Sequence, residues 1–157
     1  LKNENLNVII CGDEIYETSG HDGYLMKLIS IVESNNLTDR FKFIAFQSDV
    51  SPIYSQLDFL VHASLRPEPF GRIVSEARLC GCPVIAVDSG GSAEQIIHGE
   101  TGLLYSSEDR ALLESAIITL LDDRALRKKL AVKGRDWVGT NLSMEKFENK
   151  IRSILLN

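Results

Sequence analysis

Short apolar runs alternate along the chain with longer amphipathic stretches. The apolar runs predict β-strands, because they are rich in β-branched and aromatic residues and are bounded by polar or glycine-containing segments. The predicted strands are Asn7–Cys11, Phe41–Phe46, Phe59–His62, Val84–Val87 and Leu103–Tyr105. Their nearly continuous apolar character is typical of parallel strands that are covered on both faces.

The amphipathic stretches predict helices between and after these strands. The first spans about Gly23–Asn35 and carries its apolar residues on one face: Leu25, Leu28, Ile29 and Val32. The other expected helical segments are Pro52–Gln56, Arg72–Cys80, Ser92–His98, Arg110–Leu121, Arg124–Thr140 and Met144–Leu156. This alternation predicts an α/β fold, a Rossmann-like parallel sheet flanked by helices. No repeat or linker interrupts it, so residues 1–157 are predicted to form a single domain.

Composition excludes several classes of protein. Of the 157 residues, 44% are hydrophobic and 25% are charged, as in an ordinary globular domain. The formal net charge of −5 offers no basic footprint for nucleic acid. No apolar run approaches the roughly 18 residues that a membrane-spanning helix needs. We therefore expect a cytoplasmic protein that does not bind nucleic acid. The chain begins Leu1-Lys2-Asn3 without a methionine, which suggests an excised piece of a longer polypeptide.

The cysteines and histidines show no metal-binding spacing. The cysteines are Cys11, Cys80 and Cys82, and the histidines are His21, His62 and His98. We expect the cysteines to be reduced, buried thiols and the histidines to occupy ordinary surface or rim positions. The pair Asp122-Asp123 stands at a helix junction and is interpreted as a helix cap. The sequence therefore predicts no metal site.

The segment from Arg66 to Glu76 carries the strongest chemical signal. Glu68 stands just before a predicted helix and Glu76 lies inside it, with Pro69-Phe70-Gly71 between them. The first turn of a helix exposes unpaired amides that suit a phosphate. Carboxylates beside a phosphate would repel it unless they face neutral hydroxyls. Either glutamate alone is more simply a surface carboxylate, but together around this turn they indicate a site for a sugar joined to a nucleoside through a diphosphate.

Further turns are candidate walls of the same site. Ser89-Gly90-Gly91 follows the strand Val84–Val87, at the carboxyl end where doubly wound sheets bind ligands. The alternative for this turn is a plain strand-to-helix connection. Gly12 directly follows the first predicted strand, Phe46 ends the second, and Gln47 comes after it. These residues are therefore candidates to line the same rim.

Together these motifs resemble the carboxyl-terminal half of retaining glycosyltransferases of family four, which have the two-domain GT-B architecture. The signature of that family is a pair of glutamates separated by seven residues, as at Glu68 and Glu76. The resemblance continues through Gly81-Cys82-Pro83-Val84, Gly90-Gly91, Glu94, Ile97, Gly99 and Gly102-Leu103, and upstream through Gly12-Asp13 and Asp58–Val61. It covers nearly the whole chain.

The resemblance implies a role for each of these residues. Glu68, the candidate catalytic residue, would lie near the hydroxyls of the donor sugar. Backbone amides around Phe70, Gly71 and Arg72 would meet the sugar and the diphosphate, and Glu76 would accept hydrogen bonds from the ribose. The remaining implied donor-binding residues are Gly12, Phe46, Gln47, Gly90 and Gly91. No cofactor or metal is implied, and the nucleotide sugar, linked to UDP or GDP, is a substrate.

The implied reaction is transfer of a hexosyl unit from this donor to a carbohydrate or lipid-linked acceptor with retained anomeric configuration, as in polysaccharide assembly. The family's first strand–helix unit and its amino-terminal acceptor domain have no counterpart here. We therefore expect a fragment of a larger two-domain enzyme, inactive by itself. The acceptor domain of the same polypeptide would be its partner and would carry any peripheral association with the inner face of the membrane. The alternatives are a non-catalytic donor-binding subunit of a split transferase, and a GT-B-type synthase or sugar-nucleotide epimerase.

Overall fold

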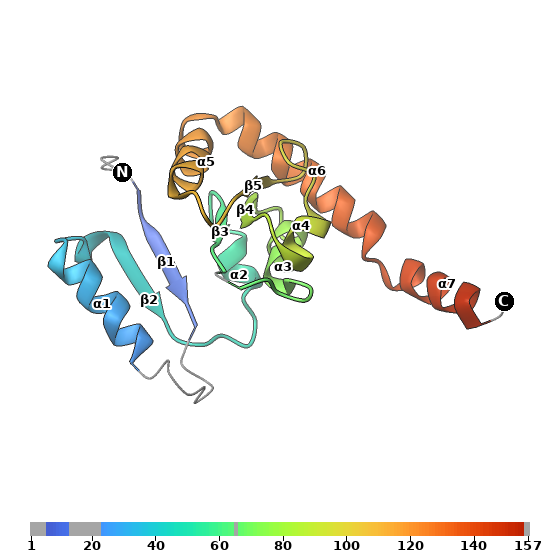
Figure 1. Ribbon diagram of the computed structural model, residues 1–157, viewed down its shortest axis with the longest axis horizontal. Helices are drawn as coiled ribbons and strands as arrows, with labels where there is room; N and C mark the ends of the chain where they lie inside the picture. The colour runs from blue at the N-terminus through green and yellow to red at the C-terminus, as the bar shows by residue number, and fades with distance from the viewer. Residues whose placement is uncertain (1–5, 13–22, 65, 156–157) are drawn as a thin grey trace. The chain divides into compact units, whose positions relative to one another are not determined.

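The computed structural model describes residues 6–12, 23–64 and 66–155. The chain divides into two compact units, Leu1–Val50 and Ser51–Asn157. Each unit is described by itself, and Figure 1 labels the elements of both. Both units are of the α/β type, and their strands all pair in parallel.

The first unit contains one parallel strand pair and its crossover. Its elements are β1 (Val8–Cys11), α1 (Tyr24–Ser34), the 3-10 helix η1 (Thr38–Arg40) and β2 (Phe41–Ile44). The pairing runs from Val8 opposite Phe41 to Cys11 opposite Ile44. Val32 is buried on the apolar face of α1, as its spacing predicts. Against the prediction of strands covered on both faces, β1 alternates between half-buried and exposed residues.

The second unit holds a three-stranded sheet in the order β3-β4-β5. The strands are β3 (Leu60–His62), β4 (Val84–Val87) and β5 (Leu103–Tyr105). The helices are α2 (Ser51–Tyr54), α3 (Arg72–Leu79), α4 (Gly90–Gln95), α5 (Arg110–Asp122), α6 (Arg124–Asn141) and α7 (Met144–Leu155). Because neighbouring strands are parallel, the loops that lead from β3 to α3 and from β4 to α4 leave the same edge of the sheet.

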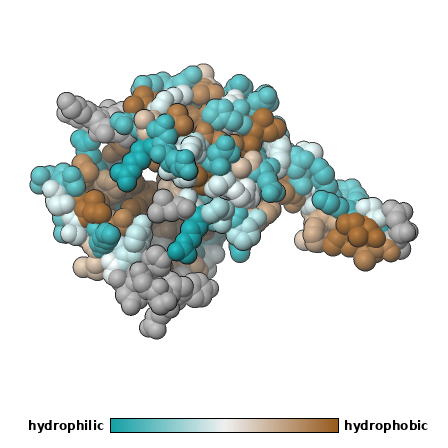
Figure 2. Space-filling view, viewed as in Figure 1, coloured by the Kyte–Doolittle hydropathy of each residue, from teal (hydrophilic) through white to brown (hydrophobic). Residues whose placement is uncertain are grey.

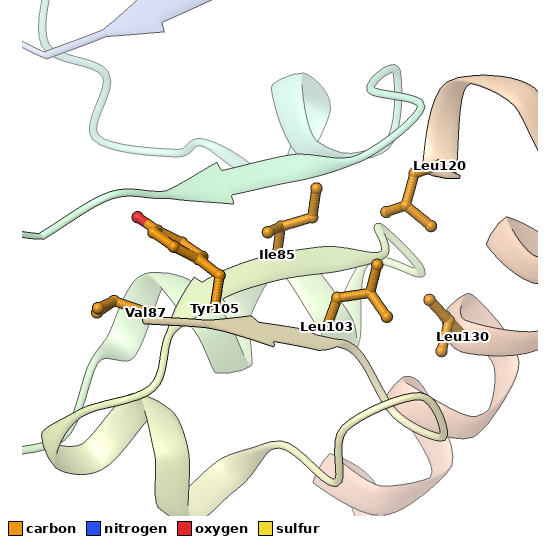
Figure 3. Packing of buried hydrophobic residues seen from close by; sticks show 6 residues of the cluster. All are labelled: Ile85, Val87, Leu103, Tyr105, Leu120 and Leu130. Carbon is orange, nitrogen blue, oxygen red and sulfur yellow. The ribbon is translucent and has the colours of Figure 1, made fainter. Parts of the chain in front are cut away.

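The core of the second unit lies between the sheet and helices α5 and α6. All four residues of β4 are buried, as the apolar run predicts. Figure 3 shows the central cluster, formed by Ile85, Val87, Leu103, Tyr105, Leu120 and Leu130. Burial raises the pKa of the Tyr105 hydroxyl in this apolar setting. Packing in this core fixes the positions of β4 and β5, and so the points at which the loops after them begin.

Helix α4 departs most from its predicted bounds. The sequence predicts Ser92–His98, but the helix begins at Gly90 and ends at Gln95. Ile96 is extended, and the hydroxyl of Thr101 accepts a hydrogen bond from the amide of Ile97 at 2.9 Å. His98 then pairs with Gly102 in an isolated parallel bridge. Residues Ile97 and His98 thus pair with Thr101 and Gly102 instead of continuing the helix.

Helix α7 carries an apolar face that the described residues do not cover. Its exposed side chains include Met144, Phe147, Ile151, Ile154 and Leu155. In Figure 2 apolar residues gather at the right, where Figure 1 places α7. The predicted last residue of this helix, Leu156, lies outside the described residues. Among the described helices, none combines the length and apolarity needed to cross a bilayer.

Candidate functional site

The loop from β3 to α3 places Glu68 and Gly71 at the carboxyl edge of the sheet. Gly71 adopts a φ of 74°, in the left-handed region that glycine tolerates best. A Cβ atom there would lie 3.0 Å from the hydroxyl oxygen of Ser92 and 3.8 Å from Oε2 of Glu68. The missing side chain therefore lets helix α3 start directly beside α4.

The turn Gly90-Gly91 packs on the backbone of this same loop. A Cβ atom at Gly90 would lie 2.5 Å from the carbonyl oxygen of Glu68, and one at Gly91 would lie 2.5 Å from that of Phe70. The amide of Gly91 donates a hydrogen bond to the Glu68 carbonyl at 2.8 Å. The two glycine-containing turns, which the sequence assigned to one candidate site, thus pack directly against each other.

The side chain of Gln95 forms hydrogen bonds to both of these turns. Its side chain is 3% exposed, and its Nε2 donates to the carbonyl of Phe70 and, at 3.1 Å, to that of Gly91. One buried amide therefore binds a carbonyl on each turn. Sequence reasoning missed Gln95, because nothing in the local pattern of α4 distinguishes it from a solvent-facing glutamine.

Glu68 is held by a buried histidine. Its Oε1 lies 3.0 Å from Nε2 of His62, the last residue of β3, and the Glu68 side chain stays 39% exposed. The other ring nitrogen, Nδ1, lies 3.4 Å from the hydroxyl of Ser92. The prediction of a surface position for His62 is wrong, because the residue is 6% exposed. The available signal was its place at the end of an apolar strand next to the candidate loop.

Glu76 pairs with a neighbour on its own helix. Its Oε1 accepts hydrogen bonds from Nη2 of Arg72 at 2.9 Å and from Nε at 3.2 Å. The Arg72 side chain is 83% exposed, so solvent screens this pair and it contributes little to stability. A groove of about 640 Å³ opens beside the pair, lined by Phe70, Arg72, Ser75, Glu76, Leu79, Val138, Gly139, Leu142 and Ser143.

The start of α3 is suited to an anion. Gly71 precedes the helix without a side-chain hydrogen bond to its first amides. Helices α5 and α6 are capped differently: Asp109 accepts from the amide of Ala111 at 2.9 Å, and Asp123 from that of Leu126 at 2.8 Å. The first turn of α3 therefore presents amides and a positive dipole end with no carboxylate cap on them. The cap predicted at Asp122-Asp123 is confirmed at Asp123.

The remaining candidates belong to the first unit. Gly12 follows β1 and its amide donates to the carbonyl of Ile44 at 3.0 Å. Phe46 is exposed, and Nε2 of Gln47 donates to the carbonyls of Ala45 and Phe46, each at 3.1 Å. Within that unit Gly12 follows β1, and Phe46 and Gln47 follow β2. Because β2 ends at Ile44, Phe46 lies beyond the strand that the sequence predicted it to end.

An unpredicted buried cation lies beneath the loops. Arg78 on α3 is 1% exposed, donates from Nη1 to the carbonyl of Gln95 at 2.6 Å, and lies 4.9 Å over the ring of Trp137. Within the described part of the chain its Nε and Nη2 have no hydrogen-bond partner. Burial lowers the pKa of Arg78 to about 10. Arg78 therefore connects α3, α4 and α6 at the back of the site.

The other histidines and the cysteines take no part in this geometry. His98 is exposed, as predicted, and His21 lies outside the described residues. All three cysteines are free thiols, but the predicted burial holds only for Cys82, whose pKa burial raises to about 12. Cys11 is exposed and Cys80 is half-buried, because each stands at the end of an element rather than within the core. Residues 6–12, 23–64 and 66–155 contain no cluster of three metal-ligating side chains.

Comparison with known proteins assigns this geometry to a family. The family model described as glycosyl transferases group 1 matches residues 1–137. The chain belongs to the group 1 glycosyltransferases. The α/β fold with its parallel sheet matches the carboxyl-terminal domains of GT-B glycosyltransferases, so the predicted fold class is confirmed.

Curated relatives place this group 1 glycosyltransferase chain among enzymes of several pathways. It is 29% identical to N-acetyl-alpha-D-glucosaminyl L-malate synthase of Bacillus anthracis over 81% of this chain and 33% of the relative. It is also 29% identical to the lipopolysaccharide core biosynthesis mannosyltransferase LpsB of Rhizobium meliloti, over 87% of this chain and 39% of that relative. The chain thus spans well under half the length of the curated relatives it matches.

Solved structures give the same assignment. Anabaena Alr3699/HepE in complex with UDP superposes with a TM-score of 0.87 and 29% identity, over 96% of this chain and 40% of that one. Sucrose-phosphate synthase from Thermosynechococcus elongatus superposes with a TM-score of 0.81 and 30% identity, over 94% of this chain and 37% of that one. The structural match therefore extends across nearly all of the chain.

Proposed function

We propose that this chain is the donor-binding part of a retaining family-four glycosyltransferase, which transfers a hexosyl unit from a UDP- or GDP-sugar to a carbohydrate or lipid-linked acceptor. The observation that carries the proposal is the contact between the Gly90-Gly91 turn and the loop that bears Glu68. It sets a partly exposed carboxylate beside the uncapped first turn of α3. The UDP complex of the Anabaena neighbour supports a nucleotide as the ligand.

Each group of this surface has a distinct task in the proposed complex. The amides at the start of α3 receive the diphosphate, since a helix N-terminus favours an anion. Glu68 accepts hydrogen bonds from hydroxyls of the sugar, and Glu76 accepts them from the ribose. The exposed guanidinium of Arg72 binds Glu76 on its own helix and no other described carboxylate. In the complex it turns toward the diphosphate, and the ribose replaces it as the partner of Glu76.

These contacts assist departure of the nucleoside diphosphate. Amide dipoles and a guanidinium placed around the diphosphate stabilise the negative charge that grows on it as the glycosidic bond breaks. The displaced diphosphate then helps to deprotonate the incoming hydroxyl on the same face, which retains the anomeric configuration. No group of this chain has to form a covalent intermediate in that route.

The partner and the location follow from the same proposal. We propose that an acceptor-binding domain of the same polypeptide completes the active site, and that the whole enzyme works in the cytoplasm or at the inner face of the membrane. On this view the chain alone binds donor but does not catalyse transfer. A second candidate is a GT-B-type synthase, which the match to sucrose-phosphate synthase favours.

Calorimetric titration tests the donor part of this proposal. The natural polypeptide that contains this chain is titrated with UDP, GDP and ADP, and then with the corresponding nucleotide sugars. We expect UDP or GDP to bind more tightly than ADP, and turnover to give a product whose anomeric configuration, read by NMR, equals that of the donor. Failure of every nucleotide to bind would overturn the donor-site proposal, and an inverted product would overturn retention.

A further inference from the structure

His62 is a buried imidazole placed between two side-chain oxygen atoms, one from the loop that precedes α3 and one from helix α4. Its Nε2 lies 3.0 Å from Oε1 of Glu68 and its Nδ1 lies 3.4 Å from the hydroxyl of Ser92. The ring is 6% exposed and Ser92 is fully buried, whereas the Glu68 side chain reaches the surface. The three side chains thus form a hydrogen-bonded chain from the buried Ser92 to the partly exposed Glu68.

The chemistry of the two partners sets the direction of these hydrogen bonds. An ionised carboxylate can only accept, so Nε2 of His62 carries the hydrogen and donates it to Glu68. In the neutral ring Nδ1 is then the acceptor, and the hydroxyl of Ser92 donates to it. Both ring nitrogens are satisfied by this tautomer. The imidazole therefore has one orientation that meets both partners.

Ser92 is itself confined. The hydroxyl oxygen of Ser92 stands 3.0 Å from the position that a Cβ atom of Gly71 would occupy, and Ser92 lies in the first turn of α4. This enclosure also excludes a nucleophilic triad, because a serine with no exposed surface cannot attack a substrate. In a nucleophilic triad the serine faces the substrate and the carboxylate is buried. Here Ser92 is buried and the Glu68 carboxylate faces solvent.

We propose that His62 is a positioning residue that holds the Glu68 carboxylate in the orientation in which it accepts hydrogen bonds from the donor sugar. This inference rests on the proposed function, because it assigns Glu68 to the sugar. A surface glutamate samples many rotamers, and fixing one of them before the ligand arrives lowers the entropic cost of binding. His62 does this from the end of strand β3, which is paired with β4.

The test compares binding of the nucleotide sugar with binding of the nucleoside diphosphate alone, so that an effect on the sugar contact can be distinguished from an effect on the nucleotide contacts. In the natural polypeptide that contains this chain, affinities for the nucleoside diphosphate and for its nucleotide sugar are measured for the unaltered protein, His62→Leu and His62→Gln. We expect His62→Leu to lose about tenfold or more in affinity for the nucleotide sugar, as for loss of a hydrogen bond to a charged group, and less than about twofold for the nucleoside diphosphate. His62→Gln keeps an N–H donor at similar reach and should recover most of the loss.

Ser92→Ala provides a second variant with little change in volume. It leaves Nδ1 of His62 without the Ser92 hydroxyl as a partner. We expect a smaller loss of affinity for the nucleotide sugar than in His62→Leu, and again almost none for the nucleoside diphosphate. Equal losses for both ligands in His62→Leu and Ser92→Ala, or no recovery in His62→Gln, would overturn the positioning role in favour of a purely structural one. Unchanged nucleotide-sugar affinity in folded His62→Leu would also overturn it. If the unaltered protein bound no nucleotide sugar, the proposed function would fail first and this inference with it.

Discussion

Glu76 is the residue whose proposed role is easiest to separate from its structural one. Its carboxylate lies at the surface of α3 and is bound by Arg72 one turn away. An exposed pair at this spacing stabilises a helix by only about 0.3–0.5 kcal/mol. Any large effect of removing Glu76 must therefore come from a ligand.

We predict that Glu76→Ala weakens binding of the nucleoside diphosphate by about 1.5–3 kcal/mol, because a charge-assisted hydrogen bond to the ribose is lost. Calorimetric titration with UDP and GDP measures this. The matched control is Glu100→Ala, which also removes one exposed carboxylate from an ion pair, at 3.6 Å from Lys133. Equal affinities in Glu76→Ala and the unaltered protein would remove Glu76 from the site.

Gly91 offers a prediction about stability at the same scale. Its Cα faces the backbone of Phe70 so closely that a methyl group would overlap it. We predict that Gly91→Ala lowers the free energy of unfolding by about 1–3 kcal/mol or more, since backbone cannot move aside as a side chain can. Urea unfolding followed by circular dichroism measures the change.

A matched glycine lies on α6. A Cβ atom at Gly139 would meet no atom within 4 Å. Gly139→Ala should therefore leave stability unchanged or raise it by up to about 1 kcal/mol, the usual gain for alanine within a helix. If the two alanine variants were equally stable, the contact between the Gly90-Gly91 turn and the Glu68 loop would be wrong.

At the scale of elements, Arg78 joins three helices without an acidic partner among the described residues. It binds the end of α4 through the Gln95 carbonyl and the face of α6 through Trp137. Gly134 makes this crossing possible, because a Cβ atom there would lie 3.2 Å from Nε of Arg78. The packing of α3 against α6 thus includes one charged side chain that is buried away from water.

The lowered pKa of Arg78 gives a pH dependence with a definite sign. The folded-state value of about 10 lies below the ordinary 12.5, so between these pH values the unfolded chain binds more protons than the folded one. Stability from this group therefore rises with pH. We predict that the unaltered protein gains about 1 kcal/mol relative to Arg78→Met between about pH 8 and pH 11. Chemical unfolding of both proteins at each pH measures the difference, and a constant or falling difference would contradict the prediction.

At the scale of the whole molecule, the division into two units has a measurable consequence. The core cluster around Leu120 and Leu130 lies entirely in the second unit, whereas Val32 is buried in the first. Cooperative units of one chain open with separate free energies. Each unit should therefore respond to a change in its own core.

We predict that Leu120→Ala destabilises the second unit by about 2–5 kcal/mol, because it leaves a cavity in a fully packed core. Hydrogen exchange read by mass spectrometry should show faster exchange in β4 and β5 and unchanged exchange in β1 and β2. Val32→Ala is the reciprocal control, with the change confined to β1, α1 and β2. Equal acceleration in both units after either substitution would mean that the chain opens as one body, as the single-domain prediction has it.

The sequence by itself determined the elements and the chemistry of the central loop. Apolar runs and amphipathic periodicity are local properties, so β4, β5 and the helices from α5 onward emerge within one or two residues of prediction. The paired glutamates and the glycine turns were equally visible, because their spacing lies within single segments. Family membership, shown by the comparisons, agrees with that pattern.

Only the tertiary structure decided which side chains hold the site together. His62 meets Ser92 thirty positions away, and Gln95 meets Phe70 across twenty-five. Burial of Arg78 likewise depends on Trp137 of a later helix. Such contacts depend on how separate strands and helices pack, and no local pattern carries that information. For the same physical reason, the sequence revealed the two glutamates but not the histidine that holds one of them.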